Sequence, residues 1–161
     1  MAGANFVNDV SALRFDEQNM LKVLNEFNVP IVIMYSKDLG PRTTAFAQEY
    51  DNVVETIKTF LQKRIEFLVA NGVDKSRIIV DPGMGGFVSS VAKYSFEIID
   101  RLAELKTLGC PILVGTSRKS FLGGDVKDRL EASIKTAKEC VENGASIVRV
   151  HDVKQTVQAL L

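Results

Sequence analysis

Five short apolar runs divide the chain, and each of them ends at polar residues or glycine. The runs are FV, PIVI, RIIV, PILV and SIV, and they predict strands at 5–8, 29–34, 77–81, 111–115 and 146–150. Unbroken apolar runs, without polar alternation, are typical of parallel strands that are buried on both faces. The sequence therefore favours a parallel sheet.

Segments with helical periodicity separate these runs. We expect helices at 16–27, 50–71, 92–108 and 126–142, and a last one from about Val153. In the second of them, apolar residues recur every three or four positions, as on the buried face of a helix. Strands that alternate with helices predict right-handed crossovers between parallel neighbours.

A similarity between two segments of the chain bears on the architecture. AGANFVNDV at 2–10 resembles NGASIVRVHDV at 143–153, where Gly144 follows a helix and precedes a strand. By analogy a helix should precede Gly3, but there is none, so we expect the chain to begin in the middle of a larger fold. A (β/α)8 barrel needs about 250 residues, so we expect a single domain, 1–161, that forms five βα units of a partial TIM barrel. Periodicity also allows the alternative of an open five-stranded doubly wound sheet.

Charge and composition exclude several functions. The chain has 20 basic and 20 acidic residues, and this balance argues against non-specific binding of nucleic acid. No apolar stretch is long enough for a membrane span, and the first residues lack the features of a signal peptide. Cys110 and Cys140 show no metal-ligand spacing, so we interpret both as reduced packing residues and expect a cytoplasmic protein.

Polar residues mark the carboxyl ends of the expected strands. In an α/β barrel these ends meet at one face, where the active site lies. Asn8 follows the first run, and Asp81 opens the segment DPGMGGF after the third. A buried carboxylate needs partners, and glycines let the backbone approach a ligand. The alternative is a tight turn in which Asp81 only caps backbone amides.

The fourth strand is followed by GTSRKSFLG. Gly115 leaves space at the strand end, and Lys119 adds a positive charge on an apolar stem. Ser117 and Ser120 fall where we expect a helix to begin, and helix N-termini bind anions. The alternative is a helix cap with solvated cations.

The fifth strand carries RVHD. Arg149 and His151 lie two positions apart, so they point to the same side of a strand and could grip an anion at the barrel mouth. His151 is the only histidine, which excludes a site with several histidine ligands. A histidine satisfied by neighbouring backbone is the alternative.

Five segments together resemble dihydropteroate synthases over essentially the whole chain: NDVSAL (8–13), VPIVIM (29–34), DPGMGGF (81–87), PILVGTSRKSFLG (111–123) and IVRVHDVKQTV (147–157). SRKSFLG and RVHDV are the most specific. The resemblance implies an enzyme of folate biosynthesis that joins 6-hydroxymethyl-7,8-dihydropterin diphosphate to p-aminobenzoate. Pyrophosphate and 7,8-dihydropteroate are the products.

The same resemblance implies roles for individual residues. The pterin would contact Asn8, Met34, Asp81, Gly115 and Lys119, and p-aminobenzoate would contact Ser117, Ser120 and Phe87. Arg149 and His151 would bind the diphosphate, and together with Lys119 they would form the catalytic set. The family also implies Mg²⁺ at the leaving diphosphate and a homodimer formed through the C-terminal helices.

Three features depart from the family pattern. Tyr35 stands where the family carries histidine, and the loop after Asp81 leaves open whether Met84 or Phe87 stacks on p-aminobenzoate. The first three βα units, which would carry the metal ligand and the mobile substrate loops, have no counterpart here, so we name no metal ligand. We therefore expect little or no activity from these residues alone and a complementing N-terminal portion as a partner.

A non-catalytic pterin-binding or interaction module is the alternative function. A flavodoxin-like domain ranks last, since GxGxxG and GxxxxGK[ST] are absent.

Overall fold

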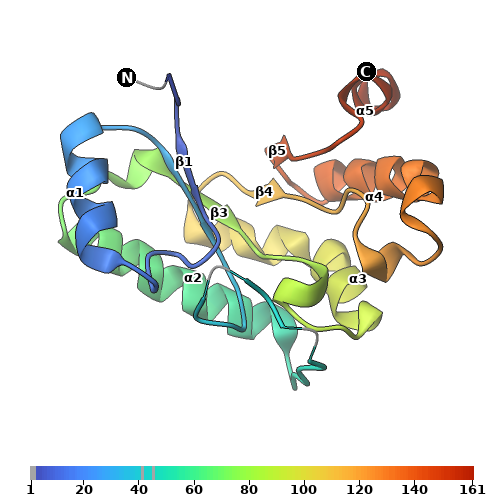
Figure 1. Ribbon diagram of the computed structural model, residues 1–161, viewed down its shortest axis with the longest axis horizontal. Helices are drawn as coiled ribbons and strands as arrows, with labels where there is room; N and C mark the ends of the chain where they lie inside the picture. Colours follow the sequence, from blue (N-terminus) through green and yellow to red (C-terminus); the bar gives the residue numbers. More distant parts are fainter. Residues whose placement is uncertain (1–2, 41, 45) are drawn as a thin grey trace.

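The computed structural model describes residues 3–40, 42–44 and 46–161, and five strands alternate with five α-helices in this part of the chain (Figure 1). The strands are β1 (Val7–Asp9), β2 (Ile31–Met34), β3 (Ile78–Asp81), β4 (Leu113–Val114) and β5 (Ile147–Val148). The helices are α1 (Glu17–Phe27), α2 (Val53–Ala70), α3 (Ala92–Asp100), α4 (Leu130–Glu142) and α5 (Val153–Leu160). Among the described residues, none of the helices combines the length and the apolar character that crossing a bilayer requires.

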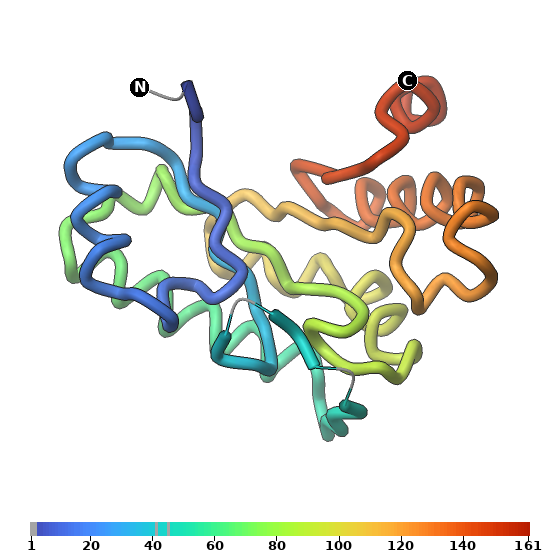
Figure 2. Tube along the Cα trace, in the orientation of Figure 1, coloured from blue at the N-terminus to red at the C-terminus, as the bar shows by residue number. Residues whose placement is uncertain are grey.

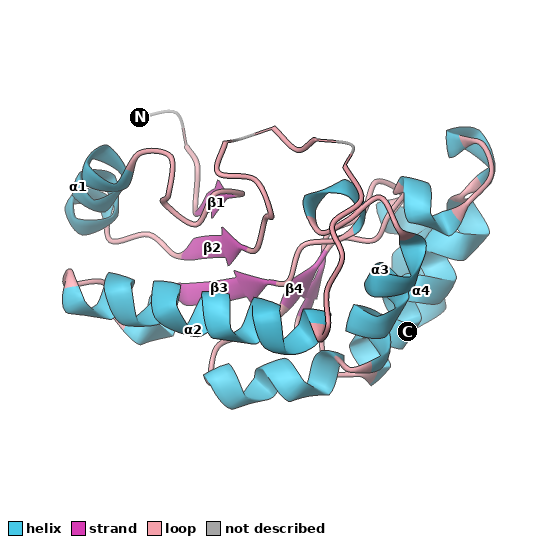
Figure 3. Cartoon of the chain, turned by 90° about the horizontal axis from the view of Figure 1, so that it is seen from below, coloured by secondary structure: helices cyan, strands magenta, loops and turns pink. Residues whose placement is uncertain are grey.

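The strands lie side by side in the order of the sequence. β1, β2 and β3 form one parallel sheet, and β4 and β5 form a second parallel pair. A bridge between Val80 and Ile112 joins β3 to the β4 segment, so the order runs from β1 to β5 without a reversal. A doubly wound sheet requires a reversal, so that alternative is wrong. The predicted partial barrel is confirmed, and the sheet of the described residues is not closed (Figure 3).

Each strand has an outer face under the helices and an inner face. Ile33, Val80 and Val114 belong to the outer face, and they share one apolar core with residues of α1 to α4. Val32 and Met34 alternate with these residues and are buried on the inner face instead. Helices on only one face are what a barrel wall requires. In the Cα trace of Figure 2, β1 and β5 lie on opposite sides of the central strands.

Two predicted helices begin or end elsewhere than expected. The helix expected at 92–108 ends as α3 at Asp100 and continues as a 3₁₀-helix over Leu102–Leu108. Leu102, Leu105 and Leu108 are all buried, and a spacing of three keeps them on one face of a 3₁₀-helix.

The helix expected at 126–142 starts only at Leu130. Arg129 donates hydrogen bonds to the carbonyl oxygens of Gly123, Gly124 and Arg118. These bonds hold the preceding segment in a looped connection, and only a short 3₁₀ turn, Val126–Asp128, forms before α4.

Candidate active site at the strand ends

The inner face carries a row of predicted site residues at the carboxyl ends of the strands. Met34 and Asp81 are register partners on β2 and β3, so both side chains lie on this face. Asn8 pairs in register with Val32 and lies on the same face. Gly115 and Arg149 follow β4 and β5 directly. The structure therefore brings the predicted pterin-binding residues to one mouth.

Asp81 is the buried centre of this mouth. Its side chain is only 2% exposed. Oδ1 accepts a hydrogen bond from the Gly83 N–H at 2.8 Å, and Oδ2 accepts one from Nη2 of Arg149 at 3.1 Å. Burial raises the pKa of Asp81, while the Arg149 charge and the Gly83 amide act in the opposite direction. Asp81 thus caps the turn, as the alternative interpretation of DPGMGGF predicted, and its carboxylate also faces the mouth.

The turn after Asp81 requires glycine. Gly83 has φ +70°, and a Cβ there would lie 2.4 Å from the Tyr35 carbonyl oxygen. The Tyr35 N–H in turn donates to the Asp81 carbonyl oxygen at 2.9 Å. The close approach of the two strand ends fixes the position of the Asp81 carboxylate.

Arg149 reaches across the mouth. Its Nη1 donates to Oδ1 of Asn8 at 2.7 Å while Nη2 contacts Asp81. The guanidinium lies against Gly115, where a Cβ would be 3.2 Å from Nη2. Glycine at this position therefore leaves room for a flat group over the strand end.

Lys119 closes the other side of the mouth. Its Nζ donates to the Met84 carbonyl oxygen at 2.9 Å and lies 5.1 Å from the centroid of the Phe87 ring. Burial lowers the pKa of Lys119 to about 8, although the Asp81 charge raises it. Of the two candidates for stacking, the Met84 side chain is fully buried in the core, and Phe87 is partly exposed beside Lys119.

Ser117 and His151 form a direct pair. The Ser117 hydroxyl accepts a hydrogen bond from the His151 backbone N–H at 3.2 Å and lies 3.0 Å from Nδ1 of its ring. Next to them, Arg118 binds both carboxylate oxygens of Asp152 at 3.0 and 2.6 Å. Neither pairing was predicted from the sequence; the opposite charges of Arg118 and Asp152 were a signal for the second of them.

The expected helix N-terminus at Ser117 and Ser120 is absent from the described structure. Ser120 is exposed and opens a three-residue 3₁₀ turn, Ser120–Leu122, and the α-helix starts at Leu130. The glycines after this turn and the Arg129 bonds prevent an earlier start. That part of the prediction was wrong, and a helix dipole does not contribute an anion site there.

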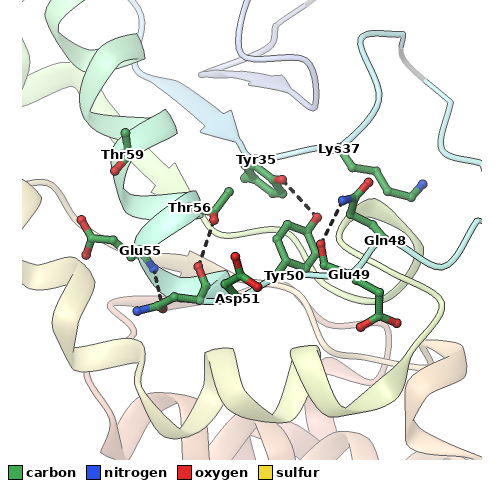
Figure 4. A pocket seen from close by; sticks show the side chains of 10 residues that line it. Tyr35, Lys37, Gln48, Glu49, Tyr50, Asp51, Glu55, Thr56 and Thr59 are labelled. Carbon is green, nitrogen blue, oxygen red and sulfur yellow. Dashed lines mark hydrogen bonds between the residues drawn. The ribbon is translucent and has the colours of Figure 1, made fainter.

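A groove of about 730 Å³ lies outside this mouth, at the N-terminus of α2 (Figure 4). Its lining includes Tyr35 and Tyr50, whose hydroxyls are 3.1 Å apart. Tyr50 donates onward to the Val88 carbonyl oxygen, and the Tyr35 ring packs edge-on against Phe60. The groove contains none of the predicted pterin-binding residues, and its tyrosines are partnered, so we place the candidate site at the mouth.

The mouth residues do not fit a magnesium ion. Within residues 3–40, 42–44 and 46–161, no three histidine, cysteine, aspartate or glutamate side chains are grouped as metal ligands. The carboxylate at the mouth, Asp81, is paired with a guanidinium. Mg²⁺ prefers several oxygen ligands, so we derive no step through a metal.

Comparison with known proteins agrees with this geometry. Residues 1–151 match the family described as pterin binding enzyme, and the chain belongs to this family. Its similarity is to dihydropteroate synthases in particular. That of Synechocystis is 35% identical over 98% of this chain, which corresponds to 55% of the relative. The resemblance seen in the sequence is thereby confirmed.

Solved structures give the same result. Dihydropteroate synthase from Stenotrophomonas maltophilia, with imidazole in its active site, superposes with a TM-score of 0.91 at 34% identity, over 99% of this chain and 60% of that one. The Xanthomonas albilineans enzyme with 4-aminobenzoic acid gives a TM-score of 0.86 at 34% identity, over 99% and 56%. The chain spans a little over half the length of these three relatives.

Proposed function

We propose that this chain carries the pterin- and diphosphate-binding part of a dihydropteroate synthase. The observation that supports this most is the buried Asp81 carboxylate at a mouth shared with Asn8, Lys119 and Arg149. A carboxylate that faces the N–C–N donor edge of an aminopyrimidine makes two parallel hydrogen bonds. Met34 would form a wall of the same pocket, and Gly115 would leave room for the ring.

The anionic tail of the substrate would lie toward the fifth strand. Arg149 and His151 would bind the diphosphate, and Ser117 orients His151. Ser117, Ser120 and Phe87 would contact p-aminobenzoate, and the Phe87 ring lies 5.1 Å from the Lys119 ammonium. Lys119 would donate to the pterin, with its stem against the aromatic substrate.

The proposed reaction is a displacement at the pterin methylene. The bond from this carbon to the diphosphate oxygen breaks, and its electron pair leaves with pyrophosphate. The amino group of p-aminobenzoate then forms the new C–N bond and loses a proton. The residues of this chain would contribute positioning and charge stabilisation. Three further βα units, outside these 161 residues, would complete the eight-stranded barrel and supply the Mg²⁺ ligand.

Binding of 6-hydroxymethyl-7,8-dihydropterin diphosphate to the 161-residue chain tests the pocket. We expect Asp81→Asn to abolish the binding heat in a calorimetric titration, because an amide presents a donor to the pterin amino group. Asp125→Asn is the matched control, since this carboxylate is exposed and does not cap the 3₁₀ turn that follows it. Equal heats for Asp81→Asn and the wild type would refute the assignment.

Turnover needs a second experiment. We expect pyrophosphate release in the presence of p-aminobenzoate only after a polypeptide with the three missing units is added. Pterin binding without turnover in that mixture would favour the second candidate, a non-catalytic pterin-binding module. The open edges of the described sheet, at β1 and β5, are the observation in its favour.

Self-association is a separate part of the proposal. Val141 on α4 and Val153 and Val157 on α5 are exposed apolar side chains near the C-terminus. We propose that these helices pair in a homodimer. Sedimentation of the wild type and Val157→Lys tests this; unchanged monomers in both would contradict it. The cytoplasmic location remains a prediction from sequence.

A further inference from the structure

Arg149 occupies the place that the proposed function gives to the pterin ring. Its two terminal nitrogens donate to Asn8 and to Asp81, at 2.7 and 3.1 Å. Oδ1 of Asp81 accepts a hydrogen bond from the Gly83 amide, and Oδ2 accepts the one from Arg149. A ligand that needs this oxygen meets a bound guanidinium first.

The guanidinium is a chemical analogue of the pterin edge. Both groups present two N–H donors on either side of one carbon atom, and this fork matches the geometry of a carboxylate. The guanidinium also lies beside Gly115, with Nη2 and Nε at 3.2 and 3.4 Å from an ideal Cβ. In this structure one donor of the fork goes to Asp81 and another goes to Asn8, so the guanidinium takes the same two acceptors that are proposed for the pterin ring.

The exposure of Arg149 allows a ligand to replace its guanidinium at Asp81. The Arg149 side chain is 44% exposed, while that of Asp81 is 2% exposed. The carboxylate is thus a fixed acceptor, and the arginine is a long side chain that can leave it. When the arginine leaves, Asp81 loses its cationic partner in a buried position, and the guanidinium must find another anion.

We propose that Arg149 determines specificity for pterins that carry an anionic tail. In the free protein its guanidinium binds Asp81 and Asn8 in place of the pterin. This inference rests on the proposed pterin function. A pterin with a diphosphate displaces the guanidinium from Asp81 and gives it a new anionic partner in the same step. A pterin without the tail displaces it and offers nothing in return, so it binds weakly.

Titrations with two ligands test this exchange. The probes are 6-hydroxymethylpterin and its diphosphate, with the wild type, Arg149→Met and Arg149→Lys. We expect Arg149→Met to bind the tailless pterin several-fold more tightly than the wild type and the diphosphate about tenfold more weakly, as for the loss of a charge-assisted hydrogen bond. Affinity changes of opposite sign for the two ligands would support the exchange. Changes in the same direction, or none, would overturn the proposal.

Guanidinium ion provides a second measurement on the same variants. At low millimolar concentration, far below denaturing levels, it should compete with the tailless pterin in Arg149→Met, and an equal concentration of sodium chloride should not. In the wild type, where the side chain fills the position, guanidinium should have no effect. Absence of competition in a folded Arg149→Met protein would also overturn the proposal.

The Asp81→Asn variant separates the two levels of inference. If Asp81→Asn binds both pterins as well as the wild type does, the proposed pocket itself is refuted. If Asp81→Asn abolishes binding and Arg149→Met shows no opposite changes, the pocket stands and only the exchange fails. Arg149→Lys keeps the charge but not the fork, so we expect it to bind the tailless pterin more tightly as well.

Discussion

The Ser117 hydroxyl contacts His151 twice, at its backbone N–H and at Nδ1 of its ring. An oxygen that accepts from the backbone N–H has its own proton free for Nδ1. We infer that the hydroxyl donates to Nδ1, so that the neutral ring carries its proton on Nε2. Ser117 is therefore a positioning residue for the proposed diphosphate site.

The first prediction concerns Ser117→Ala. Without the hydroxyl, Nδ1 loses its partner, and we expect a mixture of ring tautomers in ¹⁵N NMR spectra. Pyrophosphate affinity should fall several-fold, while affinity for a tailless pterin stays the same. Ser120→Ala is the matched control, because Ser120 is exposed and lies outside this pair. A single unchanged tautomer in Ser117→Ala would contradict the assignment.

The turn at Gly83 gives a stability prediction. Gly83→Ala combines a positive φ with a clash against the Tyr35 carbonyl oxygen, so the free energy of unfolding should fall by about 3 kcal/mol. Gly124 also has a positive φ, of +60°, but open space around it. Gly124→Ala should therefore cost only about 1 kcal/mol. Urea unfolding measures both, and equal losses would mean that the close contact has no energetic role.

Lys119 gives a prediction about pH. Its pKa is about 8 in the folded protein and 10.5 as the ordinary value. Between these values the unfolded chain binds more protons than the folded one, so the Lys119 contribution to stability increases as pH rises from 8 to 10. Below pH 8 the ammonium is charged in both states, and its burial is unfavourable.

The comparison is between the wild type and Lys119→Met, which keeps the apolar stem. Urea unfolding at pH 7 and at pH 9.5 should show the stability difference shifting in favour of the wild type at the higher pH. A difference that does not change with pH would show that the ammonium is not desolvated.

The tyrosines of the outer groove allow a further comparison. Tyr50 donates to the Val88 carbonyl oxygen at 2.8 Å, and the Tyr35 hydroxyl lies 3.1 Å from the Tyr50 hydroxyl. Tyr50→Phe leaves a carbonyl without its donor, so it should lower the free energy of unfolding by about 1–2 kcal/mol. Tyr35→Phe keeps the bond to Val88 and should cost less. Thermal or urea unfolding would measure the order, and the reverse order would contradict it.

The sequence predicted the elements that depend on local pattern. Apolar runs located all five strands, and the row of polar strand ends located the mouth, because parallel strands must present their carboxyl ends together. Strand order was not accessible from periodicity. The Val80–Ile112 bridge, which excludes a doubly wound sheet together with the pairing of β2 and β3, joins segments that are distant along the chain.

The sequence also did not predict which side chains pair with one another. Arg149 and Asp81 were each identified as site residues, but nothing local to RVHD or DPGMGGF shows that they bind one another. The helix expected after Ser117 failed for a similar reason, since Arg129 holds the intervening backbone through three carbonyl oxygens. Such contacts depend on the fold, and they decide which polar groups remain available to a ligand.

The outer strands of the described sheet differ from its centre in one further respect. Phe6 and Ile147, beside β1 and in β5, are 54% and 38% exposed, whereas Val32 in β2 is fully buried. Amide hydrogens should accordingly exchange with solvent fastest at the two margins and slowest in β2 and β3. The wall formed by Met34 and Asp81 would thus keep its shape, while Asn8 and Arg149, which belong to the margins, would move more.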